Sequence, residues 1–139
     1  MSYDFMVFEA SVAPKDRREF MRWFREQTQW KEKHDYLNAS VTTPNLNLWY
    51  LELIKHFPPM NGPLASDGVD DPNVTGYSIG KHMIYASFSL SVYEEAFTLV
   101  RRMAMKHSLG FFDVSAKEGE LFIPRLEEKK PPFWKFWAR

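Results

Sequence analysis

The 139-residue chain has no cysteine. This absence excludes disulfide bonds, thiolate metal sites and thiol nucleophiles. The chain also lacks an excess of either charge, because 18 Lys and Arg residues balance 18 Asp and Glu residues. Proteins that bind nucleic acids usually carry a basic excess, since contacts with phosphates supply much of their affinity. The balance therefore argues against DNA or RNA as a partner.

Long apolar runs are missing as well. No segment approaches the ~20 apolar residues that a membrane-spanning helix needs. The segment Met1–Phe5 has neither the basic part nor the apolar part of a secretory signal. We therefore expect a cytoplasmic protein with no integral membrane segment.

The sequence contains no motif in the structural context that catalysis or cofactor binding requires. Its six glycines are dispersed and form no phosphate-binding loop. None of the four histidines belongs to an i,i+4 pair. Gly76–Gly80 matches Gly-x-Ser-x-Gly around Ser78, but it lies between two predicted strands and not in the strand–turn–helix context of a nucleophilic serine. The acidic run from Asp67 to Asp71 lacks the alternating ligands of an EF-hand loop. We assign no catalytic residue and expect no metal and no cofactor.

Aromatic residues, in contrast, are abundant and make up 17% of the chain. Alternating apolar residues bounded by turn residues predict five strands, at 3–10, 74–79, 82–89, 111–115 and 120–124. Apolar residues at a 3-4 spacing predict three helices, at about 14–31, 44–57 and 91–108. Pro14 and Pro44 suit the first position of their helices, and Ser91 with Glu94 predicts a capping box for the third.

The predicted order of elements is β-α-α-β-β-α-β-β. This order predicts an α+β fold, a ferredoxin-like split β-α-β sandwich with an antiparallel sheet of about five strands and helices on one face. We place this single α+β domain at residues 1–126 and treat 127–139 as an aromatic C-terminal tail.

Two segments are not required by this fold. Residues 58–72 form a long irregular loop, and loops of this length are often functional; its acidic residues are Asp67, Asp70 and Asp71. The tail has four aromatic residues in five positions after a Pro-Pro step, among them Trp134 and Trp137. Such a tail fits docking on a partner, contact with a membrane surface, or folding back onto its own domain. The sequence leaves these three interpretations open.

Several segments resemble a family of small bacterial proteins with no assigned activity. They are Val41–Pro44, Phe57–Pro63, Asp71–Thr75, Tyr77–His82 and Lys106–Ser115, and the resemblance spans most of residues 3–123. Some small proteins of this kind resemble immunity proteins of bacterial toxin systems. The resemblance therefore implies a protein partner, namely a cognate toxin.

We accordingly expect a protein-binding module, an immunity protein that neutralises a toxin by occlusion. Acidic side chains would steer a basic partner and aromatic side chains would anchor it. The residues expected to bind the partner are Asp67, Asp70, Asp71, Tyr77, His82, Trp134 and Trp137.

Two alternatives remain at this stage. A small enzyme or ligand-binding domain would use the open face of the sheet, where Asp4, His82, Tyr85 and Asp113 could line a site. A structural homodimer would form through association of the sheets or of the tails.

Overall fold

The computed structural model describes residues 2–66 and 70–124. Asp67 and the predicted tail, with Trp134 and Trp137, lie outside the described residues. The boundary that we predict between the domain and the tail also lies outside them and stays a prediction.

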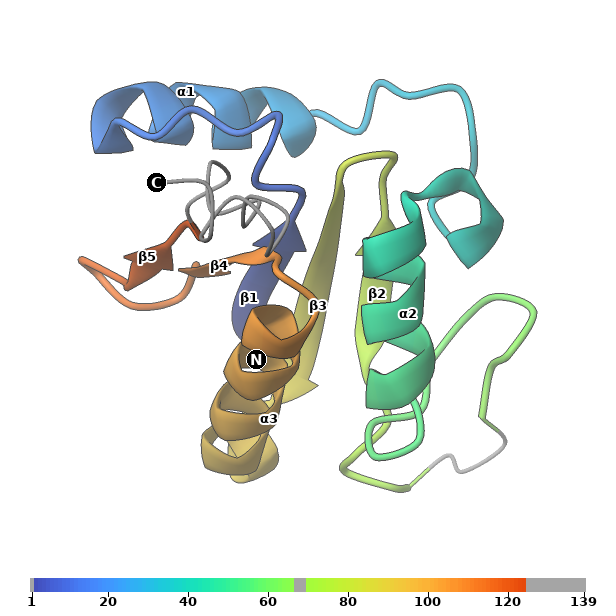
Figure 1. Cartoon of the computed structure of the whole chain (residues 1–139). Helices are drawn as coiled ribbons and strands as arrows, with labels where there is room; N and C mark the ends of the chain where they lie inside the picture. Colours follow the sequence, from blue (N-terminus) through green and yellow to red (C-terminus); the bar gives the residue numbers. More distant parts are fainter. Residues whose placement is uncertain (1, 67–69, 125–139) are drawn as a thin grey trace, which may run out of the picture.

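Five strands and three α-helices form within the described residues (Figure 1). The strands are β1 (Ser2–Phe8), β2 (Gly76–Ile79), β3 (Met83–Ser89), β4 (Gly110–Asp113) and β5 (Leu121–Phe122). The helices are α1 (Arg17–Gln27), α2 (Pro44–Leu53) and α3 (Tyr93–Lys106). Among these helices, none combines the length and the apolar character needed to cross a membrane.

All five strands belong to one antiparallel sheet with the order β2-β3-β1-β4-β5. β1 lies at its centre, pairing with β3 from Ser2 to Phe8 and with β4 from Phe5 to Phe8. The predicted α+β class and the predicted antiparallel sheet of five strands are thus confirmed.

The first helix is shorter than the predicted range 14–31. Its start is set by Asp16 instead of Pro14, because the Asp16 carboxylate accepts a hydrogen bond from the Glu19 backbone N–H at 3.1 Å. After the helix ends, Trp30 adopts a φ of 56°, which is incompatible with a continuing right-handed helix. The ends of α1 are therefore set by the Asp16 cap and the left-handed Trp30, and not by the apolar periodicity of the sequence.

The predicted capping box at the start of α3 is wrong. A short 3-10 turn, Leu90–Val92, precedes the helix, so that Val92 becomes the N-cap and offers no side-chain hydrogen bond. Ser91 lies inside this turn, where its hydroxyl contacts the Ser89 hydroxyl at 3.0 Å. α3 consequently begins at Tyr93, two residues later than predicted.

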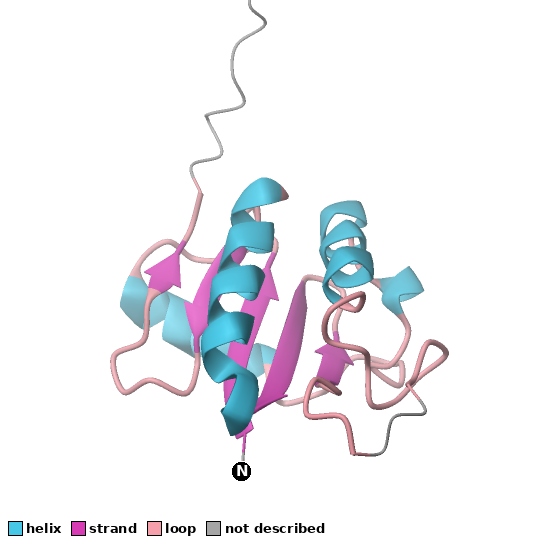
Figure 2. Cartoon of the chain, turned by 90° about the horizontal axis from the view of Figure 1, so that it is seen from below, coloured by secondary structure: helices cyan, strands magenta, loops and turns pink. Residues whose placement is uncertain are grey.

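Each face of the sheet carries its own apolar core. On one face, α2 and α3 lie side by side and pack on residues that include Phe5 and Val7. On the other face, Phe20 of α1 packs on Met6 and Phe8. Figure 2 shows α1 on the far side of the strands from α3. The prediction of helices on one face is therefore wrong: β1 is apolar on both faces, and each face needs a cover.

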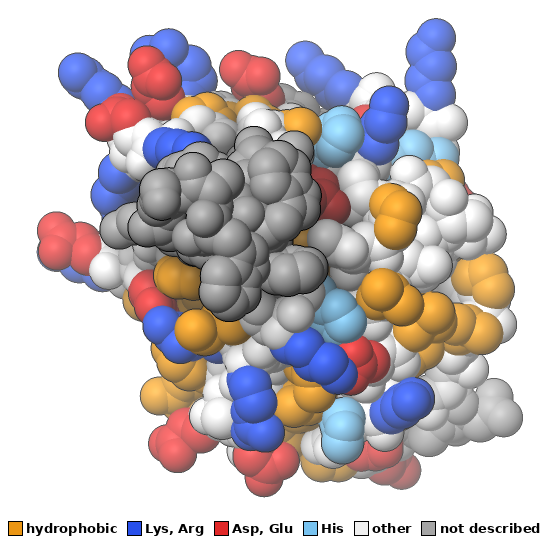
Figure 3. Space-filling model, viewed as in Figure 1, with side chains coloured by type: hydrophobic (Ala, Val, Ile, Leu, Met, Phe, Trp, Pro, Cys, Tyr) orange, Lys and Arg blue, Asp and Glu red, His pale blue; other side chains and the backbone are white. Residues whose placement is uncertain are grey.

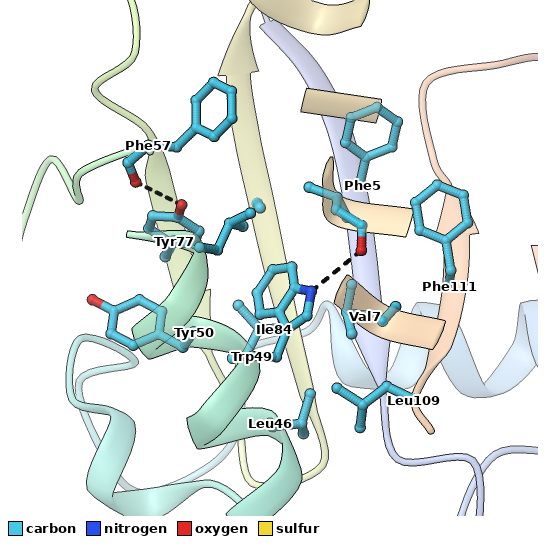
Figure 4. Packing of buried hydrophobic residues seen from close by; sticks show 14 of the residues in the cluster. Phe5, Val7, Leu46, Trp49, Tyr50, Phe57, Tyr77, Ile84, Leu109 and Phe111 are labelled. Atoms are coloured by element: carbon cyan, nitrogen blue, oxygen red, sulfur yellow. Dashed lines mark hydrogen bonds between the residues drawn. The ribbon is translucent and has the colours of Figure 1, made fainter. Parts of the chain in front are cut away.

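The core beneath α2 and α3 contains polar atoms that are satisfied internally (Figure 4). The indole N–H of Trp49 donates to the backbone carbonyl of Val100 at 3.3 Å, which joins α2 to α3. The hydroxyl of Tyr77 donates to the backbone carbonyl of Phe57 at 2.7 Å. Buried donors are costly when they lack an acceptor, so these bonds fix α2 and the segment after it against the sheet.

The core beneath α1 depends on a glycine in β4. Gly110 pairs with Phe8 of β1, and a Cβ atom on Gly110 would lie 2.2 Å from the Phe8 ring. The ring occupies the space that any larger residue would need, and it packs at a tilt against Phe20 with ring centroids 5.0 Å apart. The Phe8 ring lies so close to the backbone of β4 that this position requires glycine.

Candidate functional site

The outer face of α2 is apolar where solvent meets it. The helix buries Leu46, Trp49, Tyr50 and Leu53 in the core, yet it also leaves Leu48 and Leu51 exposed by 49% and 40%. A helix that packs one face on a core normally presents polar residues outward. Because Leu48 and Leu51 are three residues apart, they lie on the same side of the helix and form one apolar strip.

A cleft extends this strip toward the following loop. It has a volume of about 290 Å³, and its lining includes Leu51, Pro63 and Leu64, the last of which is 52% exposed. We call Leu48, Leu51, Pro63 and Leu64 together the α2 surface. Figure 3 shows hydrophobic side chains gathered over α2 and beside it. Contiguous apolar patches of this kind are typical of binding sites for other molecules.

Backbone contacts hold the loop of the α2 surface in place. The Met60 N–H donates to the Thr75 carbonyl and the Thr75 N–H donates to the Pro58 carbonyl, both at 2.8 Å. Gly62 turns the loop with a φ of 93°, and a Cβ atom there would lie 2.6 Å from the Leu37 carbonyl oxygen. The first part of the predicted 58–72 loop is therefore fastened to the edge of the sheet, and the cleft exists before any partner arrives.

An ion-pair cluster fixes α2 relative to α3. The Glu52 carboxylate lies 2.8 Å from the Lys106 ammonium and 2.5 Å from Nε2 of His107. The hydrogen bonds from Lys106 and from His107 hold the pKa of Glu52 below its ordinary value. The residue next to Leu51 thus anchors the helix, while Leu51 itself points to solvent.

The structure places the predicted partner-binding residues in different environments. Asp70 and Asp71 are exposed, and the Asp71 carboxylate accepts a hydrogen bond from the Asn73 backbone N–H at 2.9 Å. Tyr77 is only 7% exposed and belongs to the core, so its side chain does not offer a contact to a partner. Asp67 lies outside the described residues, as the two tail tryptophans do.

His82 lies half-buried in the turn before β3, away from the acidic loop. Its carbonyl accepts a hydrogen bond from the Glu9 backbone N–H at 2.9 Å. Its Nδ1 atom is buried and has no hydrogen-bond partner among the described residues. This side chain contributes to the end of the sheet and is not part of the α2 surface.

Only two of the four residues of the alternative open-face site, Asp4 and Tyr85, come together. Asp4 accepts a hydrogen bond from the Tyr85 hydroxyl at 2.6 Å. Burial, and then this bond to Asp4, raise the pKa of Tyr85. Asp113 is the cross-strand neighbour of Phe5, so its side chain lies on the face opposite to Asp4, while His82 precedes the far end of β3. The structure therefore offers no shared site for these four residues.

Sequence reasoning missed the leucines of the α2 surface. The signal was present, because the segment 44–54 has more large apolar residues than one helix face can hold. Assigning Leu46, Trp49, Tyr50 and Leu53 to the core leaves Leu48 and Leu51 without a structural role. Within residues 2–66 and 70–124, no group of three or more His, Asp or Glu side chains is placed to hold a metal ion.

Comparisons of the chain with protein-family models, with curated proteins and with solved structures find no match. The surfaces described above are therefore the basis for an argument about function.

Proposed function

We propose that the chain is a protein-binding module whose contact region is the α2 surface. The observation that carries the proposal is the exposure of Leu48 and Leu51 beside a cleft that is already formed. Leaving such side chains in water forgoes about 25 cal/mol for each Å² of apolar area, which a partner recovers when it covers them. A fixed cleft also lowers the entropic cost of binding, because little of the loop needs to be ordered.

We further propose that the partner is a cognate toxin and that the chain acts in the cytoplasm as its immunity protein. Two observations support this step: the resemblance in sequence described above, and the exposed carboxylates of Asp70 and Asp71, which continue the loop of the α2 surface. Acidic residues around an apolar centre speed the approach of a basic partner and disfavour acidic ones. The toxin surface that fits would have apolar side chains at its centre and basic residues at its rim.

For the fold, we propose the ferredoxin-like split β-α-β arrangement. The strand order supports it: β3 lies between β1 and β2, and β1 lies between β3 and β4. The connection from β3 to β4 runs through α3, and the one from β1 to β2 runs through α1 and α2. β5 then extends the sheet beyond β4.

Co-expression with the products of the flanking genes tests the proposed function. We expect the wild-type chain to protect cells from a toxic neighbour and to co-purify with it in a fixed ratio. Leu51→Asp should weaken the complex by at least about tenfold, since a charge placed in an apolar contact loses well over 1.4 kcal/mol.

Val12→Asp is the matched control, because Val12 is as exposed as Leu51 and lies in the segment between β1 and α1. It should leave protection and co-purification unchanged. If both variants behave alike, or if no neighbouring product is neutralised, the proposal is wrong. Sedimentation of the purified chain tests whether the α2 surface instead forms a homodimer. A dimer that Leu51→Asp dissociates would mean that a second copy covers this surface.

A further inference from the structure

A pocket of about 340 Å³ lies on the other side of α3 from α2. It is bounded by the start of β1, the first two turns of α3 and the end of β4, and its lining consists of Tyr3, Tyr93, Glu94, Phe97, Thr98 and Asp113. Neither the packing of a core nor the formation of a turn explains why aromatic rings and carboxylates are combined here. No lysine, arginine or histidine is in the lining.

Asp113 is the unusual member of this lining. Only 6% of the residue is exposed, and its Oδ1 atom has no hydrogen-bond partner among the described residues. Its Oδ2 atom accepts from the Tyr3 hydroxyl at 3.2 Å, which is long for a hydrogen bond between two oxygens. A buried carboxylate with an unused acceptor is costly, and it persists in a protein when something other than folding requires it.

Within residues 2–66 and 70–124, no cation forms an ion pair with this carboxylate. Arg101 lies one turn further along α3 than Phe97, but its guanidinium is already held by Glu120 at 2.7 Å through paired hydrogen bonds. Burial, the largest influence, raises the pKa of Asp113, and Glu120 raises it further. The hydrogen bond from Tyr3 and the backbone of Ala116 act in the opposite direction.

Aromatic rings form the walls of the pocket. Tyr3 and Tyr93 stack with ring centroids 4.6 Å apart, and Phe97 is held edge-on against Phe5 at 5.7 Å. The faces of such rings attract cations and also pack well on aliphatic chains. Glu94 adds a second carboxylate to the lining, so an anion would be repelled from two sides.

We propose that this pocket binds a small organic molecule that carries a primary ammonium group on an aliphatic chain. The ammonium group donates hydrogen bonds to the Asp113 carboxylate, and the weakly held Tyr3 hydroxyl gives way to admit it. The aliphatic chain packs along Tyr93 and Phe97, and it can leave toward the larger groove that shares Glu94 and Thr98 with the pocket. A primary ammonium fits better than a quaternary one, because only N–H groups can donate hydrogen bonds to the Asp113 carboxylate.

Titration of the full chain with n-butylammonium, followed by NMR, tests the proposal. We expect saturable shifts of the Tyr3, Tyr93 and Asp113 signals. n-Butanol and butyrate, which have the same chain without the positive charge, should produce none, and tetramethylammonium should bind several-fold more weakly. Equal binding of n-butanol, or no saturable shift with n-butylammonium, would overturn the proposal.

Two substitutions locate the contact. Asp113→Asn should weaken n-butylammonium binding by about tenfold or more, because it removes a charge-assisted hydrogen bond. Asp4→Asn is the matched control: it makes the same change on the adjacent strand, on the opposite face of the sheet, and should leave affinity unchanged. Unchanged affinity of Asp113→Asn would refute the assignment.

A second measurement keeps the test decisive if Asp113→Asn fails to fold. Tyr93→Leu removes an exposed ring and should weaken binding several-fold. The affinity of the wild-type chain should also fall as the pH is lowered and Asp113 gains a proton. Glu94 and Glu120 are the other carboxylates facing this region. If Asp113 is the titrating group, Glu94→Gln should retain the pH dependence of binding. Loss of the pH dependence in Glu94→Gln would assign the titrating group to Glu94 and overturn the role of Asp113. Binding that persists in Tyr93→Leu without change would likewise contradict the pocket as the site.

Discussion

Asp113→Asn should make the protein more stable at neutral pH. Only 6% of the wild-type Asp113 residue is exposed, and its Oδ1 atom has no hydrogen-bond partner among the described residues. An unsatisfied buried acceptor costs about 1–3 kcal/mol, and more when it is charged. Asparagine keeps the shape and removes the charge, but its amide N–H groups gain no partner. We therefore expect a net gain of about 1 kcal/mol, or about 3 °C in the melting temperature for a domain of this size.

The pKa of Asp113 determines how the stability difference between the two proteins changes with pH. The pKa of Asp113 is raised above its ordinary value of 3.8, so the folded state binds the proton more tightly than the unfolded chain does. The stabilising effect of this proton is complete below 3.8 and is lost as the pH rises through the folded pKa. The advantage of Asp113→Asn over wild type should consequently be small in acid, grow through this range, and remain constant at neutral pH.

Urea denaturation of both proteins across this pH range measures the difference directly. Asp4→Asn provides the contrast, because the Asp4 carboxylate accepts hydrogen bonds from Tyr85 at 2.6 Å and from Ser2 at 2.7 Å. Weakening these bonds should lower stability by about 0.5–1 kcal/mol. The reasoning fails if Asp113→Asn is less stable than wild type at neutral pH, or if the difference between the two does not vary with pH. A variant that gains stability while losing n-butylammonium binding would identify Asp113 as a residue kept for a ligand.

Three further predictions concern the core and the helix contacts. Gly110→Ala should destabilise the fold by about 2–3 kcal/mol because its Cβ meets the Phe8 ring, and Phe8→Leu in the same chain should recover part of that loss in urea denaturation. Tyr77→Phe should cost about 1–2 kcal/mol by leaving the buried Phe57 carbonyl without its donor, and an unchanged urea midpoint would contradict this. The pKa of Glu52 is lowered in the folded state, so its contribution to stability is present at neutral pH and lost as the pH falls through the folded pKa. Glu52→Gln should therefore reduce the loss of stability between neutral and acidic pH.

The strands could be predicted because their signal is local. The segment that becomes β3 alternates strictly, and its observed bounds, Met83–Ser89, differ from the predicted 82–89 by one residue. Helix ends were harder, since they depend on individual side chains. Asp16 caps α1 although Pro14 fits a helix start equally well by type, and nothing in the periodicity ranks one above the other.

The candidate sites were harder still, because each depends on contacts between distant segments. Asp113 is one carboxylate among 18 acidic residues, and only the packing of Tyr3 and α3 around it makes its Oδ1 atom unusual. The α2 surface needs the 58–66 segment to fold beside α2, which backbone hydrogen bonds to Thr75 bring about. The acidic residues of the loop could be identified from the sequence. The leucines of the α2 surface could be identified as candidates only from their exposure in the structure.

The placement of α1 shows where the limit of such reasoning lies. β1 carries Phe5 and Val7 on one face and Met6 and Phe8 on the other, so both faces must be covered in a stable protein. The sequence shows this need, and it shows three helices with apolar stripes that could meet it, but periodicity does not state which helix goes to which face. Phe8 decides the matter in the structure, because its ring fills the space above Gly110 and presents an aromatic surface against which Phe20 of α1 packs. A helix confined to the other face would leave that ring in water. The glycine at 110 and the helix at 17–27 are therefore parts of one solution, and changing the glycine should loosen α1 before it disturbs α2 or α3.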